Sequence, residues 1–464
     1  MNSQPQWGVL TGVANRMLTP RQGRHGRRPP SRLFLIALIA AVAGVLTSTI
    51  VMRLSQDSGG THAGATVTGT VGGGAPRSWP AWGFTHTQFS VDADQTPVRS
   101  RTDLARQRVV QDTAIMGWGA DNPEPAPGQF SFGSLDKRMK TIRATHGTPV
   151  ITLCCAPDWM KGGAAGQTDW STLETAPAPQ HYDDYARLAA EVARRYPYVK
   201  YYVVWNEFKG FFDNARNRWG YENYTAFYNK VYAALKNVNP DLKVGGPYMV
   251  MNSNAPSDPD QSAVRGPWGS LDQRVIDAVQ YWMKNKKGAD FLAVDGWSLP
   301  EQRNSPMDEF AALSKFSAVT AWLRGLGSGL PVWWAEWYVE PPGSGWTDEH
   351  RGAVQAAAMM EFVRGGTSTA LYWSPQTSTA GECPGCLWSG TGGGTPTLTM
   401  LQNFARWFPP GSKLVGVTSS NPQVRVLATG KQLLAVNTSG DPAAATIDGT
   451  KLDLGPYEVR WVSW

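Results

Sequence analysis

The sequence predicts an α/β protein whose main part is a (β/α)8 barrel of the TIM type, with a small C-terminal antiparallel β module and an N-terminal transmembrane helix. Three observations lead to this prediction. Over residues 79–412, short apolar runs alternate with helical patterns, which indicates a parallel sheet covered by helices. Residues 413–464 contain strand patterns with no helix between them, as in an antiparallel sheet. Residues 33–52 carry no charge and are long enough to cross a bilayer as a helix.

Eight apolar runs are the predicted barrel strands. They span residues 81–84, 113–118, 148–154, 199–205, 242–245, 291–294, 332–335 and 369–373. Helical patterns follow them over residues 102–111, 135–145, 182–195, 224–237, 271–285, 306–323, 349–363 and 398–408. Eight such units are the number that closes into a (β/α)8 barrel.

The C-terminal module, residues 413–464, contains three clear strand patterns. They cover residues 424–428, 432–436 and 459–462 and are separated by Gly, Asn and Asp turns. About 50 residues bury too little surface for a robust independent sandwich. We therefore expect the module to pack on the barrel and to recruit the segment that precedes the first barrel strand.

The N-terminal region predicts a membrane anchor. Residues 1–53 contain seven Arg, no Lys and no acidic residue. Because the basic arm 1–32 precedes the apolar span 33–52, the positive-inside rule places the N-terminus in the cytoplasm and the rest of the chain outside the cell. A cleaved signal peptide is the alternative, although the leader is long and no clear A-x-A site follows the span. Residues 53–78, rich in Gly, Ser, Thr and Ala, are predicted to be a flexible linker.

The charge of the remaining chain excludes one class of partner. The net charge is +6, but removing the seven Arg of the N-terminal region leaves 36 basic against 37 acidic residues. The body therefore lacks the basic excess that is typical of nucleic-acid-binding proteins. Its 21 Trp suit a cleft lined by aromatic side chains.

Two predicted strands end in a glutamate. The run 199–204 is followed by Trp205-Asn206-Glu207, and the run 331–335 is followed by Glu336. Active sites of (β/α)8 barrels lie at the C-terminal ends of the strands, so these two carboxyl groups are expected at the same end of the barrel. Glycoside hydrolysis uses such a pair, with one carboxyl group protonated and the other ionised.

These residues resemble the Asn-Glu signature of clan A glycoside hydrolases, and Trp334-Ala-Glu336-Trp337 is similar to the nucleophile strand of that clan. Four further motifs resemble glycoside hydrolase family 39, the β-xylosidase and α-L-iduronidase family. These motifs are Ala156-Pro-Asp-Trp159, Lys243-Val-Gly-Gly-Pro247, Asp290-Phe-Leu-Ala-Val-Asp295 and Tyr372-Trp373. The resemblance covers roughly residues 80–410.

The resemblance implies a retaining O-glycoside hydrolase that requires no metal and no organic cofactor. Glu207 would be the acid/base and Glu336 the nucleophile, while Asn206 would hydrogen-bond the sugar 2-hydroxyl and Trp373 would form the floor of the reactive subsite. The sequence departs from the family where a His-x-Tyr pair is usual, because it carries Asp295-Gly-Trp297 there. An acid at this position either repels Glu336 and raises a pKa or binds a sugar hydroxyl.

Other candidate substrate contacts come from the same strand ends. His86 follows the first strand and is either a sugar contact or a core histidine. Trp159, Trp297 and Trp373 are either core residues or sugar platforms, and Tyr338 lies two residues beyond Glu336.

The four cysteines are Cys154, Cys155, Cys383 and Cys386. An exported protein can form disulfides, and we expect either a small Cys383–Cys386 loop or a bridge between the two pairs. A zinc site is disfavoured because no histidine spacing supports it.

The sequence thus predicts a membrane-tethered, extracellular retaining glycosidase whose partners are the membrane and a carbohydrate with xyloside- or arabinoside-like units. One alternative is an endo-acting clan A glycanase on the cell's own exopolysaccharide. The other is a non-catalytic carbohydrate-binding barrel. The distance between the carboxyl groups of Glu207 and Glu336 separates enzyme from binder, because a retaining pair lies about 5 Å apart.

Overall fold

The computed structural model describes residues 66–464, apart from residues 80, 88, 91–103, 105–108, 301–306, 342, 374, 377–384 and 390–392. The predicted basic arm, transmembrane helix and most of the linker lie outside the described residues. Within the described part of the chain, no helix is both long enough and apolar enough to cross a membrane.

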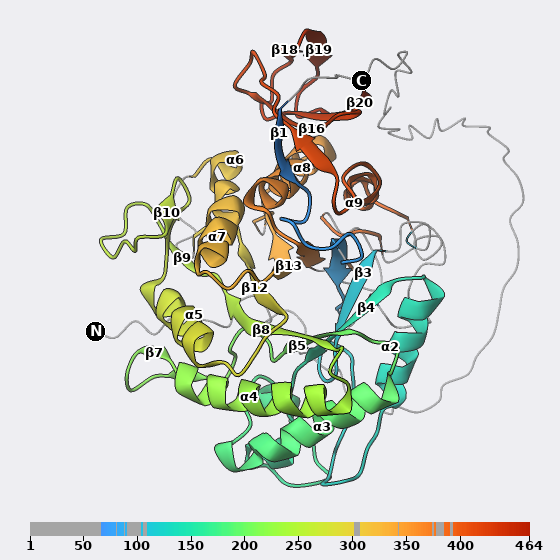
Figure 1. Cartoon of the computed structure of the whole chain (residues 1–464), viewed down its shortest axis with the longest axis vertical. Coiled ribbons are helices and arrows are strands. Elements are labelled where there is room, and N and C mark those ends of the chain that lie inside the picture. The colour runs from blue at the N-terminus through green and yellow to red at the C-terminus, as the bar shows by residue number, and fades with distance from the viewer. Residues whose placement is uncertain are drawn as a thin grey trace, which may run out of the picture. The chain divides into compact units, whose positions relative to one another are not determined.

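Eight parallel strands close into a barrel (Figure 1), as the sequence predicted. In order around the barrel they are β2 (Trp82–Thr85), β3 (Val110–Ala114), β4 (Thr148–Leu153), β5 (Tyr201–Val204), β8 (Lys243–Val250), β12 (Phe291–Trp297), β13 (Val332–Tyr338) and β14 (Thr369–Trp373). Glu207 therefore follows the fourth barrel strand and Glu336 lies in the seventh.

The described helices follow these strands along the chain. They are α2 (Gly133–Ala144), α3 (Tyr182–Arg195), α4 (Tyr221–Val238), α5 (Gln273–Asn285), α6 (Glu309–Ala312), α7 (Ser314–Gly325), α8 (Asp348–Gly365) and α9 (Pro396–Trp407). Helix α3 has the predicted bounds because Tyr185, Leu188 and Val192 recur at helical spacing and are all buried. The single helix predicted at 306–323 is two helices, α6 and α7, with the Asp308 side chain capping the first.

The second barrel strand differs most from the prediction. It covers Val110–Ala114 rather than 113–118, and the last residues of the helix predicted at 102–111 belong to it. Gln111 and Asp112 are polar, so the apolar pattern did not mark them as strand. Both are fully buried because the barrel supplies hydrogen-bond partners, Thr145 Oγ1 for Gln111 at 2.8 Å and Thr152 Oγ1 for Asp112 at 2.7 Å.

The C-terminal module contains a five-stranded antiparallel sheet in the order β1-β15-β16-β17-β20, together with a two-stranded hairpin, β18-β19. The strands are β1 (Val67–Thr70), β15 (Lys413–Val415), β16 (Val424–Thr429), β17 (Gln432–Asn437), β18 (Ala443–Ile447), β19 (Thr450–Leu454) and β20 (Val459–Ser463). Three of them match the predicted strands. The module contacts the barrel helices through Arg364, which donates to the Val426 carbonyl at 3.0 Å, and through Trp461, which packs on Trp407.

Strand β1 corrects the predicted start of ordered structure. The sequence placed residues 53–78 in a flexible linker, but Val67–Thr70 pairs antiparallel with β15. The predicted recruitment of a segment before the barrel is thereby confirmed. The physical reason is that the Val-Thr pattern suits a strand and that β15 offers an otherwise open edge.

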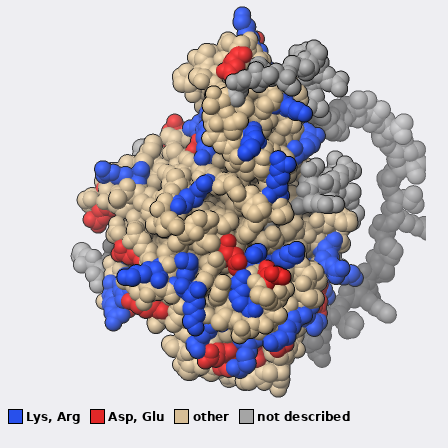
Figure 2. Space-filling model, in the orientation of Figure 1, with Lys and Arg blue, Asp and Glu red and all other residues tan. Residues whose placement is uncertain are grey.

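The loops that follow strands β4, β5 and β8 contain short 3-10 helices and short strands. They are η1 (Asp158–Lys161), η2 (Trp170–Thr172), η3 (Pro179–His181), β6 (Phe212–Asp213), β7 (Arg218–Trp219), β9 (Ser253–Asn254), β10 (Arg265–Gly266) and β11 (Gly269–Leu271). These loops lie at the C-terminal ends of the barrel strands, where such folds place their active sites. On the face shown in Figure 2, basic side chains are more prominent than acidic ones, and the two kinds are interspersed.

Candidate active site

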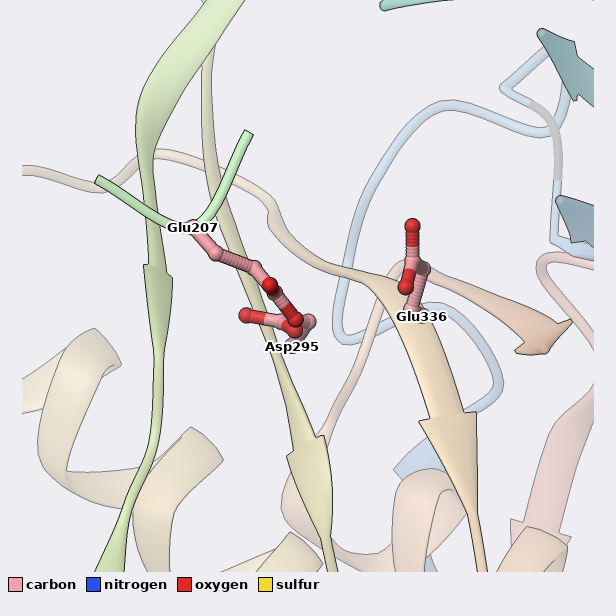
Figure 3. Close-up of side chains that lie close together, drawn as sticks. All are labelled: Glu207, Asp295 and Glu336. Atoms are coloured by element: carbon pink, nitrogen blue, oxygen red, sulfur yellow. The ribbon is translucent and has the colours of Figure 1, made fainter. Parts of the chain in front are cut away.

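Three carboxyl groups meet at the C-terminal end of the barrel. Glu207 follows β5, Asp295 lies in β12 and Glu336 lies in β13 (Figure 3). One carboxylate oxygen from each residue lies within 4.8 Å of those of the other two. The sequence predicted that Glu207 and Glu336 would lie at the same end of the barrel, and the structure brings Asp295 to them as well.

The backbone around Glu207 has an uncommon conformation. Trp205, Glu207 and Phe208 have φ angles of 70°, 50° and 57°, in the left-handed region that residues other than glycine rarely adopt. The indole Nε1 of Trp205 donates to the Lys209 carbonyl at 2.8 Å, and Phe208 stacks on Tyr224 at 3.8 Å. Such conformations persist only where the surroundings hold them, and they are concentrated at functional sites.

A β-bulge directs Glu336 into the barrel. Between β12 and β13 the register moves from Val294 opposite Trp334 to Asp295 opposite Glu336, which leaves Ala335 as an extra residue. Without it, strict alternation would place Glu336 on the outer face with Trp334. The bulge instead sets Glu336 beside Asp295 on the inner side.

Tyr248 fixes the Glu336 carboxyl group. Its hydroxyl donates a hydrogen bond to Glu336 Oε1 at 2.7 Å. Tyr248 is itself the extra residue of a second register shift, between β8 and β12. Tyr248 was not among the predicted site residues, although its place just after the Gly-Gly-Pro motif of the fifth strand was a usable signal.

Lys209 is the second residue that the sequence analysis missed. Its ammonium group lies 2.9 Å from Glu207 Oε2 and 2.7 Å from Glu174 Oε1. It also lies 5.4 Å from the ring centroid of Trp118. Lys209 therefore places a positive charge directly against Glu207.

The surroundings give the three carboxyl groups different pKa values. Burial tends to raise the pKa of Glu207, but the charge of Lys209 and a hydrogen bond with Asp295 bring it below its ordinary value. Burial, followed by the charge of Glu207, raises the pKa of Asp295 well above its usual range. Burial and the Glu207 charge likewise raise the pKa of Glu336, against the opposing effect of the Tyr248 hydrogen bond. In the unliganded site these directions favour the ionised form of Glu207 and the protonated form of Asp295, and Glu336 carries a charge only above its raised pKa.

Three predicted aromatic contacts lie at the same rim. Trp297 and Tyr338 are two residues beyond Asp295 and Glu336 on their strands, stand opposite each other in the register and stack with their ring centroids 5.7 Å apart. Trp373 is half-buried at the end of β14. These positions suit the wall and floor of a sugar subsite.

Asn206 is buried next to Glu207, at 3 % exposure. Among the described residues, no group donates a hydrogen bond to its buried Oδ1 atom. A buried acceptor without a donor is uncommon, so this oxygen is suited to a ligand hydroxyl.

His86 and Trp159 have protein partners instead. His86 is buried, hydrogen-bonds Ser90 Oγ at 2.9 Å and Gln111 Oε1 at 3.0 Å, and burial lowers its pKa to about 3. This is the core histidine of the two predicted alternatives, because both ring nitrogens are engaged by protein groups. Trp159 donates to the Glu124 carbonyl at 2.9 Å and packs its ring on His181.

The cysteines correct another expectation. Cys154 and Cys155, neighbours at the end of β4, form a disulfide with each other, so the predicted bridge between the two cysteine pairs is wrong. Because the partner is the adjacent residue, spacing rules for disulfides did not suggest it. Cys386 is also disulfide-bonded, and Cys383 lies outside the described residues.

Within the described ranges, the spacing of these same three carboxyl groups could hold a metal ion. Lys209 already supplies a cation to Glu207. Protons on Asp295 and Glu336 compete with metal ligation, because a ligand must be deprotonated. The arrangement fits proton transfer better than metal binding.

A closed eight-stranded barrel with adjacent glutamates at the ends of its fourth and seventh strands defines a class, the retaining glycoside hydrolases of clan A. Residues 120–292 match the family model described as Glycosyl hydrolases family 39. The match runs from before α2 to the start of β12, and over these residues the chain is similar to a family of glycoside hydrolases. No curated protein sequence matches it.

Solved structures share the fold at low sequence identity. A GH39 enzyme from Xanthomonas axonopodis pv. citri is 17 % identical with a TM-score of 0.52, covering 80 % of this chain and 73 % of its own. A monomeric β-xylosidase from Caulobacter crescentus CB15 is 16 % identical with a TM-score of 0.53, covering 80 % and 75 %. An endo-β-1,4-mannanase from Thermotoga petrophila is 10 % identical with a TM-score of 0.53, covering 83 % and 98 %. At these identities the likeness shows the barrel fold alone.

Proposed function

We propose that the chain hydrolyses β-xyloside-like or arabinoside-like glycans by double displacement, with Glu336 as the nucleophile and Glu207 as the acid/base. The observation that supports this most is the spacing of the carboxylate oxygens of Glu207 and Glu336, which lie within 4.8 Å of each other. Retaining enzymes hold their two carboxyl groups about 5–5.5 Å apart, whereas inverting enzymes need about 6.5–9.5 Å to admit a water molecule. A binder without catalysis has no need for this spacing.

The reaction proceeds in two steps. Glu336 attacks the anomeric carbon while Glu207 protonates the departing glycosidic oxygen, which leaves the sugar esterified to Glu336. Glu207 then deprotonates a water molecule that attacks the same carbon and releases the sugar with its configuration retained. Tyr248 holds Glu336 in place through its 2.7 Å hydrogen bond.

The walls of the site support the proposed substrate class. The stacked pair of Trp297 and Tyr338 offers apolar faces to the C–H groups of a sugar ring. The buried Oδ1 of Asn206 accepts a hydrogen bond from the 2-hydroxyl, a contact that strengthens in an oxocarbenium-like transition state. One of the structures with the same fold is named a β-xylosidase, and we propose the same sugar class here.

We also propose that residues 33–52 tether the enzyme to the membrane with the barrel outside the cell. The basic arm before an uncharged span supports this topology. Protease treatment of intact cells tests it. Digestion of the barrel, with protection of an epitope fused to residue 1, is the expected result, and full protection of the barrel contradicts it.

The activity is tested with a panel of aryl glycosides and xylan- and arabinan-type oligosaccharides, using wild type, Glu336→Ala and Glu349→Ala. Glu349 is exposed on α8, which makes it a matched control. Wild type and the control are expected to cleave a xyloside or arabinoside. Glu336→Ala is expected to lose on the order of 10⁴-fold or more in kcat, the scale that follows removal of a nucleophile.

Two results contradict the proposal. One is a wild-type enzyme that cleaves none of the panel, and the other is a Glu336→Ala variant that remains as active as the control. Binding of an oligosaccharide without cleavage supports the non-catalytic alternative. Cleavage in the interior of long chains, with no release of single sugars, supports endo action.

A further inference from the structure

We propose that Asp295 is a positioning residue that holds the proton of the acid/base, so that Glu207 and Asp295 share one proton and Lys209 controls which carboxyl group carries it. This inference rests on the proposed function of Glu207. It adds a third carboxyl group to the two that the double-displacement mechanism needs.

The geometry places Asp295 where it can do this. Its side chain is buried, at 2 % exposure, and it hydrogen-bonds with the Glu207 carboxyl group. Figure 3 shows the Asp295 and Glu207 carboxyl groups against each other, with Glu336 standing apart on the neighbouring strand. Two carboxyl groups joined by a hydrogen bond hold a proton between them, because both cannot be ionised cheaply at this distance.

Lys209 explains why Glu207 needs such a partner. Its ammonium group, 2.9 Å from Glu207 Oε2, stabilises the ionised form of Glu207. A general acid must nevertheless deliver a proton when the glycosidic oxygen departs. The O–H of Asp295, donated to the Glu207 carboxylate, keeps that proton one transfer away.

The charged and titratable groups that face Asp295 are Glu207 from the turn after β5, Glu336 from β13 and Lys209 from the loop after Glu207. Tyr248, from β8, faces the same cluster through its hydrogen bond to Glu336. Asp112, from β3, acts through its charge on Glu336 and Tyr248. The proton inventory of the site is therefore set by four acids, one ammonium group and one phenol.

The proton balance closes over the two chemical steps. The first step starts with ionised Glu336 and one proton on the Glu207–Asp295 pair. The bond between the anomeric carbon and the leaving oxygen breaks as Glu336 forms a bond to that carbon, and the Asp295 proton passes to Glu207, which delivers it to the leaving oxygen. The pair gains one negative charge as Glu336 loses one to the new ester bond. In the second step the pair recovers a proton from water, and Glu336 regains its charge when the ester is cleaved. The net charge of the cluster is the same throughout, which suits a buried site.

The test replaces Asp295 by Asn and compares two probes. Phenyl β-D-xylopyranoside has a poor leaving group and needs the acid, whereas 2,4-dinitrophenyl β-D-xylopyranoside needs none. In Asp295→Asn the proton rests on Glu207 alone, whose pKa Lys209 keeps low, so the alkaline limb for the phenyl glycoside moves to lower pH. At pH 7 its kcat/KM falls on the order of 100-fold, while cleavage of the dinitrophenyl glycoside changes little.

A rescue makes the test specific. Lys209→Met removes the charge that keeps Glu207 ionised, so burial raises the pKa of Glu207. Asp295→Asn/Lys209→Met is therefore expected to regain activity on the phenyl glycoside at pH 7 relative to Asp295→Asn. Lys209→Met alone is expected to move the alkaline limb to higher pH, a result that does not depend on how well Asp295→Asn folds.

The matched control is Asp290→Asn. Asp290 immediately precedes β12, at the end of the strand opposite Asp295, and pairs with Lys236 at 2.8 Å. The pH profile of the Asp290→Asn variant should therefore equal that of wild type. The inference is overturned if Asp295→Asn keeps the wild-type alkaline limb, if it slows both probes equally, or if Lys209→Met leaves that limb in place. A wild type that cleaves neither these probes nor any member of the glycoside panel, or an active Glu336→Ala, overturns the proposed function instead.

Discussion

The two ends of the barrel interior are built from the same strands but from opposite kinds of side chain. At the N-terminal end, Trp79 meets Tyr201, Phe291 and Trp333 edge-on at centroid distances of 5.7, 6.1 and 6.0 Å. At the C-terminal end, four residues beyond Phe291 and three beyond Trp333, stand Asp295 and Glu336. Each of the seven-residue strands β12 and β13 thus contributes an aromatic side chain to the core at one end and a carboxyl group to the site at the other.

Backbone irregularity and buried charge are confined to the C-terminal end of the barrel interior. The N-terminal end follows regular register, with Phe291 stacked on Trp333 at 4.0 Å. The C-terminal end carries the Ala335 bulge and the positive φ angles after β5. Stability is supplied by the aromatic end, and the other end retains buried carboxyl groups that do not favour folding.

Phe291→Ala tests the stabilising end and should have the largest effect. It removes a fully buried ring that stacks on Trp333, and a loss of about 3–5 kcal/mol in the free energy of unfolding is expected. Activity per folded molecule should remain near wild type, measured below the lowered melting temperature. A selective loss of kcat with unchanged stability would contradict the division between the ends.

Asp112→Asn tests the boundary between the aromatic end and the reactive end of the barrel interior. Asp112 is fully buried in β3, and burial raises its pKa to about 7. The folded state then binds a proton that the unfolded chain releases between about pH 4 and pH 7, so stability decreases as pH rises through this window. The shift from 3.8 to about 7 corresponds to about 4 kcal/mol. Urea unfolding at pH 5 and pH 8 should show a smaller difference for Asp112→Asn than for wild type.

Tyr248→Phe tests the C-terminal, reactive end of the barrel interior and should have the smallest effect of the three substitutions. The ring keeps its packing, but Glu336 loses the 2.7 Å hydrogen bond that lowers its pKa. Because the reaction needs ionised Glu336, the acid limb of kcat/KM should move to higher pH, and the maximal rate should fall about tenfold. An unshifted acid limb would show that Tyr248 does not act through Glu336.

The sequence predicted the parts of the fold whose pattern is regular. Strand β14 and helix α3 have the predicted bounds because apolar residues recur there at the spacing of their element. Strand β3 was displaced because Gln111 and Asp112 are polar residues whose hydrogen-bond partners include Thr145 and Thr152 from elsewhere in the fold. Burial of such residues depends on tertiary partners that a local pattern does not contain.

The same limit applies to the candidate site: residues marked by a local pattern were predicted, and contacts that depend on tertiary pairing were not. Glu207 and Glu336 were recognisable because each follows an apolar run in the sequence. The bulges at Ala335 and Tyr248 depend on pairing between strands, which a single sequence does not display. The position of Lys209 depends on Glu174 from another loop, and so its contact with Glu207 was not predicted.

The pairing of β1 with β15 determines how the molecule bears mechanical load. Strands β1 and β20 lie at the two ends of the described chain, and both belong to the same five-stranded sheet. A force applied through residues before 66 reaches the described fold at the β1–β15 backbone hydrogen bonds, not at a barrel strand. Strand β1 must therefore separate from β15 before a force applied through these residues reaches the first barrel strand, β2.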